Sequence, residues 1–321
     1  MLNNPKFYAI ATVILWSAFA PLAKMVSKSQ FLYVTLSFAF TTLTFLSILA
    51  YRMRLELFSR LRAMKPQYLF FGLFGYFIYW IGLIQSFREF SSASGTTVLN
   101  YTWPVFTVIF TEMVFRRTVK APLQRAVEAV GILLGFGAVF VLATKGQIWS
   151  FEITHARGLA WGLLAGASYG FFSAYSGSVP REFHGVFLLT SAVVSLAAML
   201  PFAWTELDML RRISPRDFLF IFLLGSAVDG GGYFLWTSAN LIAREQNVDI
   251  STVSSIAFFL PLISVIIVSI LLGEGEIFRP YFAVTLVLLI SGSVICQKTR
   301  EITIKLQSFY ERKQSRRRRQ P

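Results

Sequence analysis

The sequence predicts an all-α membrane protein of ten transmembrane helices, arranged as two inverted five-helix repeats. Its 321 residues are 55% hydrophobic and only 14% charged, whereas soluble domains carry about 25% charged residues. Apolar runs recur along the chain, most of them near the roughly 20 residues that cross about 30 Å of hydrocarbon as a helix. The two halves also share landmark residues at one constant offset.

Ten apolar segments are expected to cross the membrane, with short connections between them. The first segment is longer than the apolar core of a signal peptide, and Pro21 follows its small-residue site, so we expect it to be retained. The segments are 7–26, 31–51, 67–87, 94–115, 126–144, 158–178, 186–205, 218–239, 251–272 and 281–297.

The distribution of Lys and Arg predicts that both termini are cytoplasmic. With this orientation, 21 of the 30 basic residues fall in inner segments and 9 in outer ones, in agreement with the positive-inside rule. Topology therefore explains the net charge of +14, and no nucleic-acid partner is expected. The expected surroundings are a lipid bilayer, and both a monomer and a dimer are compatible with the sequence.

Pro104 lies near the middle of the fourth segment. Proline removes a backbone donor and clashes with the preceding turn, so the helix is expected to break near Asn100. The freed carbonyl must find a partner in protein or in a wet cavity, because lipid supplies none. Broken helices at mid-membrane commonly form the substrate sites of transporters, and Pro261 repeats the feature in the ninth segment.

A shift of 157 residues places Tyr76 on Tyr233 and Pro104 on Pro261. Each unit has five segments, an odd number, so the second unit starts on the opposite side of the membrane and an axis in the membrane plane relates the two. Such a pair can open a central cavity to one side and then to the other, which predicts a transporter rather than a static duplicated scaffold. The units are residues 1–145 and 146–298, followed by a basic cytoplasmic tail, 299–321.

The tail ends in four consecutive arginines, 316–319. We expect it to be a disordered charged end that enforces the orientation of the chain. The alternative is a contact with anionic lipid, to which each basic residue near the surface contributes about 1 kcal/mol.

Asp229 lies near the middle of the eighth segment and is followed by three glycines. A charged carboxylate at the bilayer centre costs at least about 2.5 kcal/mol, so it is expected to face a cavity or to be protonated. The glycines weaken the helix and let a ligand or another backbone come close. Two roles remain open, namely a carboxylate that binds a proton or an amine, and a buried acid paired with a neighbouring helix.

Trp and Tyr residues occupy mid-span positions here, whereas interfacial belts hold them at helix ends. Their polar atoms need partners or a wet cavity, so the expected partner is a small-molecule substrate, an aromatic or cationic organic solute. Packing between helices is the alternative, and short polar groups beside the expected breaks could hydrogen-bond the solute. Together with Asp229, the candidate substrate-binding residues are Trp16, Ser17, Tyr76, Tyr79, Asn100, Tyr101, Trp103, Tyr169, Tyr233, Trp236 and Phe258.

Glu112 and Glu128 fall at the inner ends of the fourth and fifth segments, near Arg116, Arg117 and Arg125. We interpret them as surface charges whose stems lie along the membrane edge. An ion network at an inner gate is the alternative.

Other chemistry finds little support. His155 and His184 are isolated, so neither a metal nor another cofactor is expected. The single cysteine, Cys296, cannot form an internal disulfide, and no GxxxxGK stretch provides a phosphate-binding loop. A membrane-embedded enzyme would need a nucleophile or a metal cluster in its spans, and the sequence offers none, so the chain is not expected to be an enzyme.

These features resemble the drug/metabolite transporter superfamily, EamA family. The residues that carry the resemblance are Leu15-Trp16-Ser17, the run Asn100-Tyr101-Thr102-Trp103-Pro104, Pro261, and Gly273-Glu274. The NYxWP element and Tyr233-x-x-Trp236 are similar to those of bacterial aromatic amino acid exporters of this family. The chain departs from the pattern in its long basic tail and in Arg116-Arg117, where the second half has Gly273-Glu274.

The resemblance implies an exporter of amino acids or related metabolites in the bacterial inner membrane. It also implies a cavity lined by spans one, three, four, six, eight and nine. An importer or exchanger of another class, nucleotide-like or cationic, is the alternative. An anionic substrate would require buried cations, and only Lys24 and Arg88 are candidates, both near segment ends.

Overall fold

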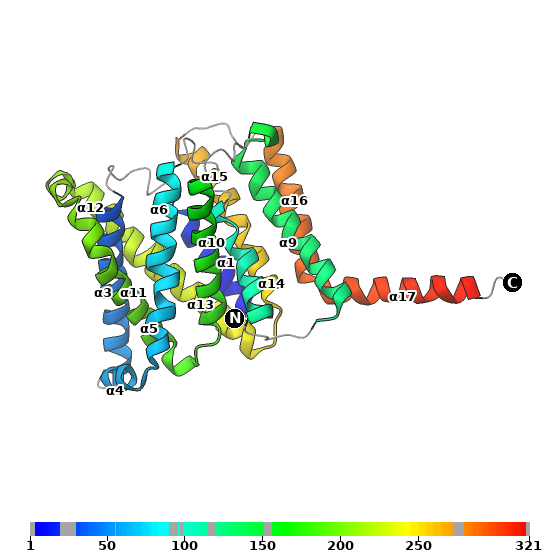
Figure 1. Ribbon diagram of the computed structural model, residues 1–321, viewed down its shortest axis with the longest axis horizontal. Coiled ribbons are helices and arrows are strands. Elements are labelled where there is room, and N and C mark those ends of the chain that lie inside the picture. Colours follow the sequence, from blue (N-terminus) through cyan, green and yellow to red (C-terminus); the bar gives the residue numbers. More distant parts are fainter. Residues whose placement is uncertain are drawn as a thin grey trace.

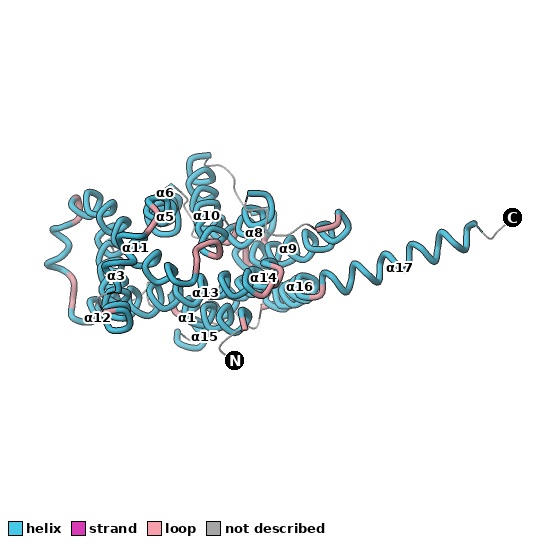
Figure 2. The backbone as a smooth tube through the Cα atoms, turned by 90° about the horizontal axis from the view of Figure 1, so that it is seen from below, coloured by secondary structure: helices cyan, strands magenta, loops and turns pink. Residues whose placement is uncertain are grey.

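The computed structural model describes residues 4–19, 30–54, 56–89, 96, 99–114, 120–150, 156–272 and 279–318. All regular elements within these residues are helical (Figure 2). Most of the helices run roughly along one direction (Figure 1), and seven described segments are long and apolar enough to cross a membrane. The chain is thus an integral membrane protein, and helices lie within each of the ten ranges expected from the sequence.

Three helices of the first half begin at prolines, which fit the first turn because their missing N–H would have no partner there. Pro5, Pro66 and Pro122 occupy such positions. The elements are α1 (Pro5–Ser17), α3 (Phe31–Met53), α4 (Glu56–Ala63), α5 (Pro66–Leu73), η1 (Phe74–Ile78), α6 (Tyr79–Glu89), α8 (Trp103–Ile109), η2 (Phe110–Val114), α9 (Pro122–Ala143) and η3 (Ile148–Ser150).

The second half follows the same order of long and interrupted helices. Its elements are α10 (Ala156–Ser176), α11 (Arg181–Trp204), η4 (Leu207–Arg212), α12 (Pro215–Leu223), η5 (Leu224–Gly231), α13 (Gly232–Glu245), α14 (Ile250–Ala257), α15 (Phe259–Leu272), α16 (Pro280–Gln297) and α17 (Thr299–Arg318).

Two helices are interrupted just before a proline. α8 begins at Trp103 after a turn at residues 101–102, with Pro104 in its first turn. In the second half, α14 ends at Ala257 and α15 begins at Phe259, shortly before Pro261. Each proline lacks the backbone donor that would have continued the preceding helix, so the chain changes course at these points.

Two further long helices are interrupted by π-helical turns, η1 and η5, which widen the helix locally and are frequent at functional sites. In η5, Gly225 has no side chain to separate it from α3: a Cβ there would lie 2.7 Å from the Cβ of Phe40. The Thr41 hydroxyl consequently reaches the carbonyl of Gly225 at 2.7 Å. This close packing fixes η5, and with it Asp229, against α3.

α9 and α16 pack side by side and run in opposite directions (Figure 1). Glycines allow the close approach, because a Cβ on Gly292 would lie 2.6 Å from the carbonyl oxygen of Gly131 and 2.8 Å from the nitrogen of Gly135. Such stripes of small residues let membrane helices approach closely. The start of α1 and the end of α16 lie at the same end of the bundle, since Lys6 donates to the side-chain oxygen of Gln297 at 3.1 Å.

The expectation of a disordered tail is wrong for residues 299–318, which form the helix α17. Lys305 lies 3.9 Å from Glu301, one turn earlier on the helix surface, and pairs at this spacing favour helix formation. The first part of α17 also packs against α9. Arg116-Arg117 and Gly273-Glu274, which mark the chain's departure from the family pattern, lie outside the described residues.

Candidate functional site

A cavity of about 320 Å³ lies among α1, α6, residues 100–103, α9, α10, η5 with α13, and α15. It lies toward the end of the bundle at which α6 and α9 finish, because Phe87 and Ala143, at or near those helix ends, contribute to its wall. The wall also includes α9, the fifth segment, which the family resemblance did not imply.

Trp16 forms the centre of an aromatic cluster in the cavity wall. The centroid of its ring lies 6.0 Å from that of Trp103 and 5.9 Å from those of Tyr169 and Tyr233. Its indole N–H donates to the carbonyl of Val228 at 3.0 Å, a group of the π-helical η5. Edge-to-face contacts of this kind hold the rings in fixed orientations.

Asp229 is the acidic residue of the cavity wall and is only 5% exposed. The Ser37 hydroxyl of α3 donates to its Oδ2 at 2.5 Å. Among the residues that the structure describes, no cation pairs with Asp229. An ionised carboxylate without a counter-ion is costly to bury, so this group is suited to bind a proton or a cationic group that enters the cavity.

Eight of the twelve candidate binding residues line the cavity, as does Pro261. They come from five separate parts of the chain, which the fold brings together around one space. These eight are Trp16, Tyr79, Asn100, Tyr101, Trp103, Tyr169, Asp229 and Tyr233.

The other four candidates lie behind the wall. The Ser17 hydroxyl donates to the carbonyl of Val13 at 2.6 Å within its own helix, and the Trp236 indole donates to the Ser173 hydroxyl at 2.7 Å. Tyr76 stacks on Tyr233 with ring centroids 4.1 Å apart. Phe258 is 1% exposed and packs where a Cβ on Gly135 would stand. These side chains support the wall rather than form it.

Several wall residues escaped the sequence reasoning. Leu83 and Phe87 lie four and eight residues after Tyr79, so helical spacing from that candidate would have found them. Phe19 and Ser264 lie three residues after Trp16 and Pro261 and follow from the same spacing. The aliphatic part of the wall, Leu83 among it, is neither polar nor aromatic and so did not meet the criteria for candidates.

Known proteins resemble this chain in the sequence of its first half and in its fold. Residues 5–144 match the EamA-like transporter family. The resemblance read from the sequence is therefore confirmed at the level of the family, over the part that carries α1 to α9. A solved structure, titled only "Crystal structure of protein", shares the fold with a TM-score of 0.73 at 17% sequence identity, covering 93% of this chain and 98% of its own. No curated protein sequence matches the chain.

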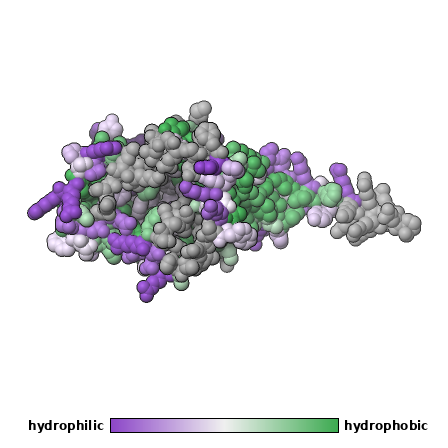
Figure 3. Space-filling view, turned by 90° about the horizontal axis from the view of Figure 1, so that it is seen from above, coloured by the Kyte–Doolittle hydropathy of each residue, from purple (hydrophilic) through white to green (hydrophobic). Residues whose placement is uncertain are grey.

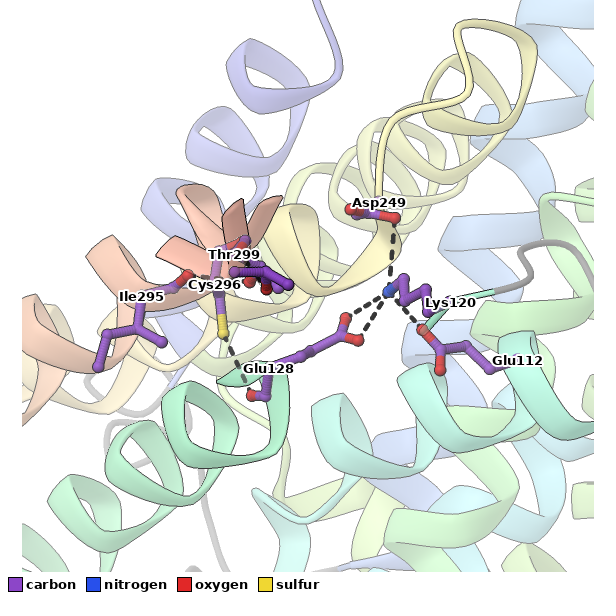
Figure 4. A network of polar contacts seen from close by, with 8 residues as sticks. Glu112, Lys120, Glu128, Asp249, Ile295, Cys296 and Thr299 are labelled. Carbon is purple, nitrogen blue, oxygen red and sulfur yellow. Dashed lines mark hydrogen bonds and ion pairs between the residues drawn. The ribbon is translucent and has the colours of Figure 1, made fainter. Parts of the chain in front are cut away.

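A buried ion cluster lies at the other end of this EamA-like half, where η2 ends and α9 begins (Figure 4). The ammonium of Lys120 donates to both carboxylate oxygens of Glu128 at 2.7 Å and also to Glu112. Asp249, which precedes α14 in the second half, lies 3.4 Å from the same nitrogen. The side chains of Lys120 and Glu128 are each 3% exposed. Our interpretation of Glu112 and Glu128 as surface charges is therefore wrong.

The charges of this cluster do not balance, since three carboxylates surround one ammonium. Burial lowers the pKa of Lys120, but Glu128, Glu112 and Asp249 raise it more, so the pKa lies above its usual value. Lys120 therefore stays charged at neutral pH. Lys120 could not be recognised from the sequence as the partner of Glu112 and Glu128, because it lies in a loop, eight residues from each of the two glutamates.

Proposed function

We propose that this chain is a secondary transporter that exports small organic metabolites, most favourably amino acids, by alternating access. The observation that carries the proposal is a buried carboxylate, Asp229, in an aromatic cavity beside two helices that break before Pro104 and Pro261. The family of residues 5–144 is one of transporters, which favours transport over enzymatic activity. We also propose that the protein lies in the bacterial inner membrane with both termini in the cytoplasm.

The chemistry of the cavity favours a solute with an ammonium group and an apolar part. Asp229 offers a carboxylate, and Asn100 Oδ1 is buried without a hydrogen-bond partner among the described residues, so both can accept from an ammonium. The faces of Trp16 and Tyr169 attract cations, and such contacts are worth about 0.5–2 kcal/mol. The volume of about 320 Å³ lies at the lower end of the range for small-molecule sites, which favours a solute the size of a single amino acid.

A cationic organic solute is the second candidate, because it would use the same carboxylate and rings. A nucleotide-like anion is disfavoured, since the described wall of the cavity contains no Lys or Arg. Arg88 donates to Gln30 at 3.0 Å and lies 3.4 Å from Glu206, outside the cavity wall. Lys24 lies outside the described residues.

The proposed mechanism uses two inverted repeats, residues 1–145 and 146–298. Three observations support this. Tyr76 and Tyr233, which correspond at an offset of 157, stack on each other, as residues close to a two-fold axis would. The helix interruptions at Tyr101 and Phe258 are also 157 residues apart in the sequence. α9 and α16, the last helices of the two units, pack against each other in opposite directions (Figure 1).

In this proposal the Lys120 cluster is the inner gate. The cavity lies toward one end of the bundle, and the cluster lies at the other, where it joins Glu112 and Glu128 of the first unit to Asp249 of the second. With cytoplasmic termini, the described conformation is open outward and closed inward. Opening to the cytoplasm would have to separate Asp249 from Lys120.

Counterflow into proteoliposomes, with a panel of labelled amino acids, tests the proposal. We expect at least one amino acid to exchange above the level of empty liposomes. Asp229→Asn should abolish this exchange, and Asp208→Asn, a matched change of an exposed acid, should leave it intact. If no amino acid or organic cation exchanges, or if Asp229→Asn exchanges like the wild type, the proposed site is wrong.

A further inference from the structure

α17 leaves the bundle sideways. It begins at Thr299, two residues after α16 ends, and extends away from the other helices at a steep angle to α9 and α16 (Figures 1 and 2). If α9 and α16 cross the membrane, α17 must run along the membrane surface, at the level where they end.

One face of α17 is apolar. Ile302, Leu306, Phe309 and Tyr310 follow the spacing i, i+4, i+7 and i+8, which places them on one side of a helix. Near the bundle this side is covered, since Thr303 is 6% exposed where α17 packs against α9. Farther out it is uncovered, and Phe309 and Tyr310 are 62% and 58% exposed.

The flank of the bundle from which α17 extends is hydrophobic (Figure 3). Leu133 of α9 and Val287 and Ile290 of α16 are exposed there, as side chains facing lipid would be. The apolar side of α17 is thus covered by protein beside α9 and uncovered beyond it, next to a flank that lipid would cover.

The rest of α17 and the chain end are strongly basic. On a helical projection Arg300 lies opposite the apolar side, and Lys305 and Arg312 flank its edge, four residues before and three residues after Phe309. Residues 299–321 hold eight basic and two acidic residues. A single weak signal rarely holds a protein segment on a membrane, whereas an apolar face combined with a basic cluster does.

We propose that α17 is an interfacial helix that binds the surface of an anionic bilayer. Phe309 and Tyr310 insert at the boundary of headgroups and acyl chains, and the basic residues contact the lipid phosphates. Anionic lipid is the occupant that matches both the charge of the segment and its place beside a lipid-facing flank. The inference does not depend on what the protein transports.

Thiol accessibility in the full chain tests this inference. In a Cys296→Ser background, single cysteines are introduced by Phe309→Cys on the apolar side and by Glu311→Cys on the polar side. The proteins are reconstituted into phosphatidylcholine vesicles with or without phosphatidylglycerol, and a membrane-impermeant charged maleimide is added. Leu306→Cys tests the apolar side again while Phe309 and Tyr310 stay in place.

In vesicles with phosphatidylglycerol we expect the thiols at 306 and 309 to react at least about tenfold more slowly than the thiol at 311, since a buried apolar group is held out of water. The difference should shrink in pure phosphatidylcholine and after substitution of the four arginines 316–319 by glutamine. Equal rates on the two sides in anionic vesicles would overturn the proposal. Protection that is equally strong in pure phosphatidylcholine would also overturn it, because anionic lipid would then not be what holds the face out of water.

Discussion

Replacement of Lys120 by methionine removes the charge at the centre of the ion cluster and keeps a side chain of similar length. Both oxygens of Glu128 then lose a donor at 2.7 Å, in a place where that side chain is 3% exposed. Glu112 and Asp249 are better placed to reach water, with side chains 12% and 27% exposed. The cost should therefore arise mainly at Glu128. Breaking a buried ion pair by removing one partner costs about 3–5 kcal/mol.

Equilibrium denaturation in mixed micelles measures this cost as a change in the free energy of unfolding. We expect Lys120→Met to lose about 3 kcal/mol, and Lys120→Met/Glu128→Gln to recover much of it, because the unpaired charge is gone. The control is Lys298→Met, whose partner Glu301 lies 4.0 Å away with both side chains more than half exposed. Such a surface pair contributes no more than about 1 kcal/mol. If Lys120→Met is as stable as the control, or if the double variant is no better than the single one, the reasoning about a buried network is refuted.

Three further predictions concern the same network and the cavity wall. The difference in free energy of unfolding between the wild type and Lys120→Met should stay constant from neutral pH to about pH 9, because the pKa of Lys120 is raised and its charge stabilises the fold fully below the pKa of an unfolded lysine, about 10.4. The difference should fall as the pH rises through the higher pKa of Lys120 in the folded state. A decline already at pH 8 would contradict this. Gly232→Ala should weaken substrate affinity in a binding titration, since its Cβ would collide with the Trp16 indole; unchanged affinity would mean that Trp16 does not shape the site. Tyr233→Phe should lower the free energy of unfolding by about 1 kcal/mol, because its hydroxyl donates to a backbone carbonyl at 2.7 Å. Tyr76→Phe should lower it little, because the Tyr76 hydroxyl has no partner among the described residues. Equal losses of stability in the two variants would contradict these hydrogen-bond assignments.

The sequence was most informative where a local rule decides the structure. Proline cannot continue a helix, so the interruptions before Pro104 and Pro261 follow from residue type alone. Asp229 attracts notice because an acid in the middle of an apolar span is costly, and the structure places it in the cavity wall. The length of the apolar runs likewise predicts which segments are transmembrane helices, and helices lie in all ten ranges.

Contacts between segments that are distant in the sequence could not be predicted from such local rules. Lys120 contacts acids from η2, from α9 and from just before α14. The residues beside Lys120 in the sequence do not indicate that its partner Asp249 comes from the second half. The sequence also does not distinguish residues that line the cavity from residues that support its wall. Tyr76 and Tyr233 occupy corresponding positions, but Tyr233 lines the cavity and Tyr76 stacks behind it. The tail forms a helix although its composition suggests disorder, because part of it packs against α9.

The central claim is that Asp229 binds the ammonium of the solute within the aromatic cavity. The most direct test compares the affinity of the purified protein for the amino acid that exchanges best with its affinity for the analogue that lacks the amino group, in the wild type and in Asp229→Asn. A charge-assisted hydrogen bond contributes about 1.5–3 kcal/mol, so the wild type should prefer the amino acid by at least about tenfold, and Asp229→Asn should lose this preference while still binding the analogue. An equal preference in both proteins would contradict the account, because the ammonium would then be bound elsewhere.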